Sequence, residues 1–235
     1  AREIFDDAGT FMVGKPLRDF CNLMIESGYN KKINYGINMR FGVLKETDYQ
    51  LMMKAGFRLI LYGLESANQE TLNRLNKGIE IAEVAEELEI AKKNGIEPHV
   101  TAMIGYPWED YNEARKTVKF MRSLLKNNLI DYLQLTTIMP YPGTPLWREA
   151  KEKKWLLTNN YEDYDMSRPV LKSLLTEKQR ASLLKEAYAP PIYPRFIWGK
   201  IREIRGIGEI WGLIIDIVKL LTYWFMFLRK EKWVK

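Results

Sequence analysis

Residues that could bind a polar or charged ligand recur at the ends of apolar segments in the first 145 residues. They are Asp6 and Asp7, Arg40, Glu65, and two proline-containing turns at residues 105–107 and 140–145. Aspartates can accept hydrogen bonds from an ammonium group, a guanidinium matches a carboxylate, and a glutamate can bind hydroxyl groups or an amine. Each position also has a structural explanation. Asp7 can form a turn or cap a helix, Arg40 can pair with a neighbouring loop, and Glu65 can cap the helix that follows it.

The two turns would present backbone amides and carbonyls. Gly105-Tyr106-Pro107 and the segment 140–145 are rigid, because proline fixes one backbone angle. Such backbone can contact the edge of an adenine base, or it can simply connect two elements.

The composition gives little support for a metal site or for a catalytic nucleophile. One cysteine and one histidine exclude a disulfide framework, a structural zinc site and an iron–sulfur cluster bound by this chain alone. Cys21 lies at core spacing with Phe20 and Met24, which predicts a buried apolar residue. His99, in the middle of an expected strand, is predicted to lie in the core. Phosphate loops, nucleophile elbows and zinc-protease motifs are absent, so we assign no metal ligand and no catalytic residue.

Apolar segments typical of strands alternate with segments typical of helices. The expected strands are residues 4–6, 33–40, 58–63, 97–104 and 132–138, and the expected helices are 15–27, 46–55, 69–76, 82–94 and 109–127. This alternation predicts parallel strands joined by helical crossovers. The polar residues described above follow the strands, where the ligands of such folds bind.

Residues 33–40 favour a barrel over an open, doubly wound sheet. Their even positions carry polar residues or glycine, including Asn34, Asn38 and Arg40, whereas their odd positions are mostly apolar. A parallel strand covered by helices on both faces is apolar on both. Gln134 and Thr136 repeat the pattern, so we expect an α/β barrel of about five parallel strands with a polar interior.

The chain changes character near residue 149. We expect the barrel over residues 1–149 and a helical extension over residues 150–235. Nine of the basic residues but four of the acidic ones follow residue 189, so most of the net charge of +6 lies in the extension. Because the chain begins with Ala1 and an expected strand follows almost at once, we also expect its natural amino terminus to be missing.

The extension contains an apolar segment at residues 210–228. It is long enough to span a bilayer at ~1.5 Å per residue, but Asp216 and Lys219 would each cost roughly 2.5–3.5 kcal/mol near the membrane centre. Its polar residues share one stripe, which predicts an amphipathic helix. Residues 210–230 could lie on an anionic membrane surface, or the helix could pack on the barrel or on another domain. We expect a cytoplasmic protein, peripheral at the inner face of the membrane, and no nucleic-acid partner.

Several short motifs, taken in order, resemble the radical S-adenosylmethionine (SAM) superfamily, and most closely its branch with an N-terminal cobalamin-binding domain. The motifs are Ile-Phe-Asp-Asp at 4–7, Met-Arg at 39–40, Gly-Leu-Glu-Ser at 63–66, Leu-Asn-Arg-Leu-Asn-Lys-Gly at 72–78, Ile-Gly-Tyr-Pro-Trp-Glu at 104–109 and Pro-Gly-Thr-Pro at 142–145. Residues 186–188 and 192–196 are similar to the C-terminal extension of that branch.

The resemblance implies a partial TIM-like (β/α)₆ barrel in which a [4Fe–4S] cluster cleaves SAM and starts radical chemistry, such as methylation or another C–H transformation. It implies a reductant for the cluster, a small-molecule or lipid-like substrate, and cobalamin as a further cofactor. By position, it places Asp7 near the SAM amino group, Arg40 near the carboxylate, Glu65 near the ribose or amino group, and the backbones of Gly105, Met139 and Pro140 near adenine.

One departure from the family is large. The family's cluster is bound by a Cys-x₃-Cys-x₂-Cys loop after the first strand, and this sequence has no such loop. We therefore expect the loop, the first βα unit and any cobalamin domain to lie outside this chain, and the chain alone to be inactive. Two other interpretations are an unrelated TIM-barrel enzyme acting on a phosphorylated or sugar substrate, and a non-catalytic, membrane-associated interaction module.

Overall fold

A parallel sheet forms the centre of the molecule. The computed structural model describes residues 2–166 and 168–203. All neighbouring strands pair in parallel, in the order β1-β2-β3-β4-β5. The strands are β1 (Glu3–Asp6), β2 (Asn34–Met39), β3 (Phe57–Glu65), β4 (Glu97–Ile104) and β5 (Tyr132–Thr137). Because the order never reverses, as it would in a doubly wound sheet, the predicted partial barrel is confirmed.

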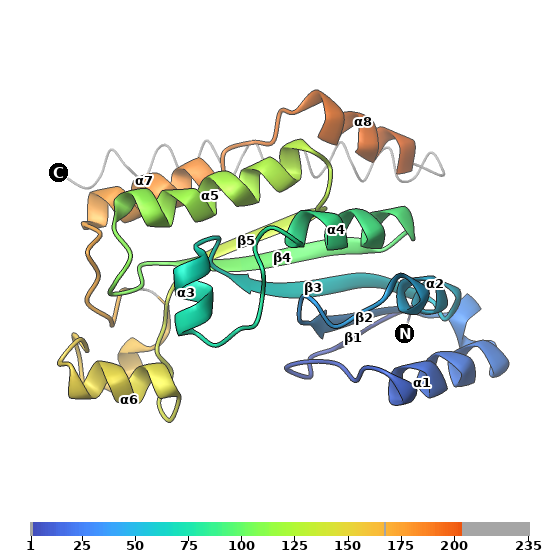
Figure 1. The fold of residues 1–235 in the computed structure, drawn as a ribbon, viewed down its shortest axis with the longest axis horizontal. Coiled ribbons are helices and arrows are strands. Elements are labelled where there is room, and N and C mark those ends of the chain that lie inside the picture. Colours follow the sequence, from blue (N-terminus) through green and yellow to red (C-terminus); the bar gives the residue numbers. More distant parts are fainter. Residues whose placement is uncertain (1, 167, 204–235) are drawn as a thin grey trace.

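Helices connect consecutive strands and follow the last one (Figure 1). Those between strands are α1 (Lys15–Glu26), α2 (Glu46–Lys54), α3 (Gln69–Arg74), α4 (Val84–Lys93) and α5 (Tyr111–Lys126), with a 3₁₀ turn η1 (Tyr29–Lys31) after α1. After β5 come α6 (Pro145–Glu152), the 3₁₀ turn η2 (Tyr161–Asp163), α7 (Glu177–Ala187) and α8 (Pro194–Glu203). The expected bounds differ by a few residues where local caps decide them. Helix α5 begins at Tyr111 because Asp110 accepts a hydrogen bond from the Glu113 amide at 2.9 Å.

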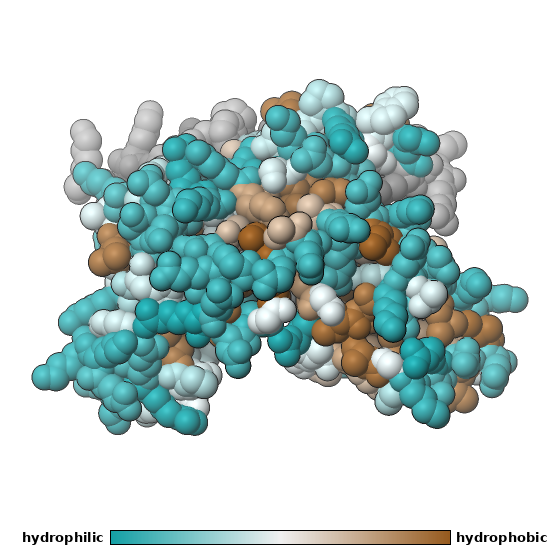
Figure 2. Space-filling view, in the orientation of Figure 1, coloured by the Kyte–Doolittle hydropathy of each residue, from teal (hydrophilic) through white to brown (hydrophobic). Residues whose placement is uncertain are grey.

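The two faces of the sheet differ as the alternation of β2 predicted. One face packs against helices, and its residues Ile60, Tyr62 and Val100 are fully buried. The other face lies opposite α4 and α5, where Figure 2 shows a recess between the regions of α1 and α6. Asn38 and Thr136 are half-buried there and Gln134 is exposed. His99 is half-buried beside Tyr132, with 5.8 Å between ring centroids, rather than in the core.

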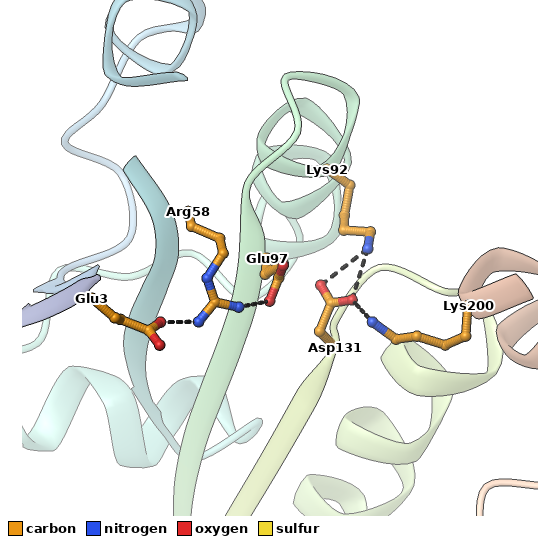
Figure 3. A network of polar contacts seen from close by, with 6 residues as sticks. All are labelled: Glu3, Arg58, Lys92, Glu97, Asp131 and Lys200. Atoms are coloured by element: carbon orange, nitrogen blue, oxygen red, sulfur yellow. Dashed lines mark hydrogen bonds and ion pairs between the residues drawn. The ribbon is translucent and has the colours of Figure 1, made fainter. Parts of the chain in front are cut away.

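Ion pairs join the amino ends of the strands (Figure 3). Arg58 on β3 lies between Glu3 on β1 and Glu97 on β4, with 2.5 Å between its Nη1 and Oε2 of Glu97. Asp131 precedes β5 and is bound by Lys92 of α4 at 2.9 Å and by Lys200 of α8. Charged contacts therefore stabilise the edge of the sheet opposite to the one where the strands end.

The residues after α6 pack against the barrel. Glu186 of α7 pairs with Arg115 of α5 at 3.0 Å. The Tyr188 hydroxyl accepts a hydrogen bond from the Leu135 amide at 2.9 Å and donates one to the Leu135 carbonyl at 2.8 Å. The Tyr188 hydroxyl thereby pairs with backbone groups of β5, which is the last strand in the sheet order.

Two further expectations concern the extension. The division at residue 149 stays a prediction, and the amphipathic segment 210–228 lies outside the described residues. In the part of the chain that the structure describes, no helix combines the length and the apolar character needed to cross a bilayer.

Candidate functional site

The six predicted ligand-binding residues all lie at the carboxyl ends of strands, which we call the carboxyl edge. Parallel pairing brings these ends to one side of the sheet. Asp7 follows β1, Arg40 follows β2, Glu65 ends β3, Gly105 follows β4, and Met139 and Pro140 follow β5.

Arg40 and Glu65 meet through a third residue, Lys77. The Lys77 ammonium lies 2.8 Å from Oε1 of Glu65, and the Lys77 carbonyl accepts a hydrogen bond of 2.6 Å from Nη2 of Arg40. The sequence motif at 72–78 contains Lys77, but nothing in its spacing showed that the loop after α3 would return to the carboxyl edge. The site therefore has two cations and one carboxylate within a short distance, with a net positive charge.

Glu65 adopts a strained backbone. Its φ is 71°, in the left-handed region that residues other than glycine rarely adopt, at a cost of about 1–3 kcal/mol. The pairing of β3 with β4 shifts register between Gly63 and Glu65. A Cβ atom at Gly63 would lie 2.9 Å from Oε1 of Glu65, so glycine there leaves room for the carboxylate. Backbone strain of this kind clusters at ligand-binding positions, which makes Glu65 a candidate for one.

A buried polar cluster supports the backbone beside Glu65. Oε1 of Glu109 accepts hydrogen bonds from the hydroxyls of Ser66 at 2.8 Å and Thr71 at 2.6 Å. The Thr117 hydroxyl accepts a bond from the Ala67 amide at 2.9 Å. All four of these polar side chains are fully buried. Burial raises the pKa of Glu109, and the two hydroxyl donors oppose that rise. Glu109 belongs to the motif at 104–109, but the sequence did not predict its supporting role.

The loop after β4 places a further buried hydroxyl, that of Tyr106, near the site. Tyr106 is fully buried, and within the described residues its hydroxyl has no hydrogen-bond partner. Burial, with the charges of Glu65 and Glu109, raises the pKa of Tyr106 well above its usual value. Gly105 has a φ of 92°, and a Cβ atom there would lie 3.4 Å from Cγ2 of Thr137. Glycine thus allows the buried turn that positions Tyr106.

The other predicted residues, Asp7, Met139 and Pro140, do not take part in the contacts between Lys77 and the pair Arg40 and Glu65. Oδ1 of Asp7 accepts a hydrogen bond from Nδ2 of Asn38 at 3.1 Å. Asp6 serves the turn that follows β1, since its Oδ1 accepts a bond from the Ala8 amide at 3.0 Å. Met139 and Pro140 are buried. Among the described residues, no hydrogen bond joins Asp7 to Arg40 or Glu65.

The residues of this chain suit SAM but not an iron–sulfur cluster. A carboxylate, two cations and a glycine turn at one edge match the amino-acid and ribose groups of SAM. A [4Fe–4S] cluster needs several thiolates, and the sequence has one cysteine. That residue, Cys21 on α1, is fully buried as predicted, and its thiol has a pKa raised to about 11 by burial and by Asp48. Within the described residues, no three His, Cys, Asp or Glu side chains are grouped to bind a metal ion.

The partial parallel barrel and the charged residues at its carboxyl edge place this chain in the class of (β/α)-barrel enzymes. Residues 5–121 match the radical SAM superfamily, and the chain belongs to this superfamily. This match removes the support for an unrelated TIM-barrel enzyme.

Curated relatives extend the match. A protein from Pyrococcus horikoshii named as an uncharacterized methyltransferase is 33% identical over 187 residues, which are 79% of this chain and 39% of the relative. The anaerobic magnesium-protoporphyrin IX monomethyl ester cyclase of Cereibacter sphaeroides is 27% identical over 67% of this chain and 25% of its own length. The chain thus spans two fifths or less of these relatives.

Solved structures share the fold. Coproporphyrinogen III oxidase from Escherichia coli, a radical SAM enzyme, superposes with a TM-score of 0.56 at 16% identity over 80% of this chain and 39% of the enzyme. The radical SAM methyltransferase TsrM from Kitasatospora setae, with cobalamin and a [4Fe–4S] cluster bound, gives 0.52 at 17% identity over 67% of this chain and 32% of TsrM.

Proposed function

We propose that the protein binds SAM at its carboxyl edge and forms part of a radical SAM enzyme. The observation that carries this proposal is the contact of Arg40 and Glu65 with the same residue, Lys77. In this proposal, Arg40 binds the SAM carboxylate, since guanidinium and carboxylate form strong charge-assisted pairs. Glu65 binds the ribose hydroxyls or the amino group, and Asp7 binds the amino group. The backbones of Gly105, Met139 and Pro140 contact adenine.

The reaction proposed for the whole enzyme is methylation or another transformation of a C–H bond. Relatives named as methyltransferases support methylation, among them the bacteriochlorophyllide d C-8(2)-methyltransferase of Chlorobaculum tepidum, which is 27% identical over 60% of this chain. The [4Fe–4S] cluster supplies the electron that cleaves SAM in this superfamily, and its thiolate ligands are not among the residues of this chain. Cobalamin is a further proposed cofactor, supported by the resemblance of the motifs and by the shared fold with TsrM.

SAM binding tests the proposal directly. We expect the purified protein to bind SAM in a calorimetric titration, and Arg40→Ala to weaken binding about tenfold, the loss expected for one charge-assisted pair. Arg195→Ala is the matched control, because Arg195 is an exposed arginine on α8. Equal affinities of the wild-type protein and Arg40→Ala would contradict the assignment of Arg40, and a wild-type protein that does not bind SAM would contradict the proposal.

We also propose that the C-terminal region contacts an anionic membrane surface, which makes the protein peripheral at the inner face and admits a lipid-like substrate. Support comes from α8, where Ile197, Trp198 and Ile201 are exposed near the basic residues Arg195 and Arg202. We expect the protein to float with vesicles containing phosphatidylserine and not with pure phosphatidylcholine. Trp198→Ser should reduce flotation, and absence of flotation with either lipid would contradict this proposal.

A further inference from the structure

An open cavity of about 520 Å³ lies beside the carboxyl edge, between the loop after β4 and the segment that joins α6 to α7. Much of its wall is apolar, with Trp155, Leu171, Leu174 and Leu175 among its residues. Leu174 is 62% exposed, although it is a large apolar side chain. Cavities of this size with apolar walls and few polar groups are typical of small-molecule sites.

Positively charged side chains outnumber negatively charged ones in the lining of the cavity. Lys172 and Arg180 line it, together with one carboxylate, Glu177. Across residues 2–166 and 168–203, neither the Lys172 ammonium nor the Arg180 guanidinium has a hydrogen-bond or ion-pair partner. Two cations without partners next to apolar walls match a ligand with an apolar body and an anionic group.

The cavity adjoins the proposed SAM site. Pro107 lines it and follows Gly105 by two residues. Ser173, also in the lining, has its hydroxyl oxygen 3.7 Å from the Cβ position at Gly105. The turn after β4 that is proposed to contact adenine therefore also borders the cavity.

We propose that this cavity binds an aromatic or polycyclic carboxylate, with Lys172 and Arg180 binding the carboxylate and Trp155 and Leu174 contacting the apolar body. Because the ligand of this cavity would be the substrate of the proposed enzyme, this inference rests on the proposed function. Ligand binding to the cavity is measured without SAM, so a failure to bind this ligand and a failure to bind SAM are separate results.

Two fluorescent probes that differ in one group test the inference. 1-Pyrenebutyrate carries a carboxylate where 1-pyrenebutanol carries a hydroxyl. We expect the purified protein to bind the butyrate about tenfold more tightly, the preference expected for charge-assisted contacts at a partly exposed site. The double variant Lys172→Gln/Arg180→Gln should lose this preference, and Leu174→Ser should weaken the binding of both probes.

Two further variants make the test specific. Lys178→Gln removes a charge from an exposed position of α7 outside the cavity, and the preference should remain. Glu177→Gln removes the one carboxylate of the lining and should tighten the binding of the butyrate. Equal binding of the two probes by the wild-type protein, or an unchanged preference in the double variant, would overturn the proposal. The four substitutions that remove a charge lie at exposed or half-buried positions, so loss of folding does not explain a loss of the preference for the butyrate.

Discussion

The Lys77 ammonium lies 2.8 Å from the Glu65 carboxylate, and the Lys77 backbone carbonyl accepts a hydrogen bond from Arg40. One residue in the loop after α3 thus contacts both the residue that follows β2 and the residue that ends β3. Lys77 and Glu65 are both largely buried, with 26% and 19% of their side chains exposed. Partial burial strengthens their attraction compared with a surface pair. The arrangement holds both predicted ligand-binding residues in place before any ligand arrives.

Glu65→Gly should stabilise the protein while it removes a ligand-binding group. Glycine adopts a φ of 71° without steric cost. We expect the free energy of unfolding to rise by about 1 kcal/mol, which is the backbone strain released less the value of the ion pair with Lys77. Urea denaturation measures this change, and SAM binding should weaken in the same variant.

Glu65→Gln is the matched variant for that prediction. It keeps the strained backbone and loses only the charge, so it should be no more stable than the wild-type protein. A Glu65→Gly protein that is less stable than Glu65→Gln would show that strain at this position is not significant.

Glu109 should make stability depend on pH. Burial raises its pKa in the folded state, so the folded protein binds this proton more tightly than the unfolded chain does. The corresponding contribution to stability is complete below the unfolded pKa of about 4.3 and is lost as the pH rises through the folded pKa.

Glu109→Gln removes this titration. The free energy of unfolding of the variant, relative to the wild-type protein, should therefore increase as the pH rises from about 4 to about 7. Urea denaturation at several pH values measures the trend. Glu70→Gln, at an exposed position of α3, is the control for the loss of a surface carboxylate. A relative stability of Glu109→Gln that stays constant with pH would be inconsistent with the raised pKa.

Cys21 should be unreactive in the folded protein. The thiolate is the reactive form of cysteine, and burial with the charge of Asp48 raises the pKa of this thiol to about 11. We expect Ellman's reagent at a pH of about 8 to label Cys21 slowly in the native protein and rapidly in urea. Rapid labelling without urea would mean that α1 does not bury this thiol.

The elements and the positions of the candidate ligand-binding residues could be predicted from the amino-acid sequence alone. Apolar segments of strand length alternate with helical ones, and this pattern is local, so it can be recognised without knowing which segments touch. The polar face of β2 likewise follows from alternation along a single strand, since successive side chains point to opposite faces. Arg40 and Glu65 were predicted because parallel strands end at a common edge.

Which side chains meet at that edge depends instead on contacts between segments that lie far apart in the sequence. Lys77 contacts Glu65 because the loop after α3 folds back, and Glu109 contacts Ser66 across 43 residues of sequence. The cavity with Lys172 and Arg180 forms where the segment after α6 packs against the turn at Gly105. Such contacts depend on how connections of irregular shape pack in three dimensions. Neither residue type nor periodicity encodes that packing locally.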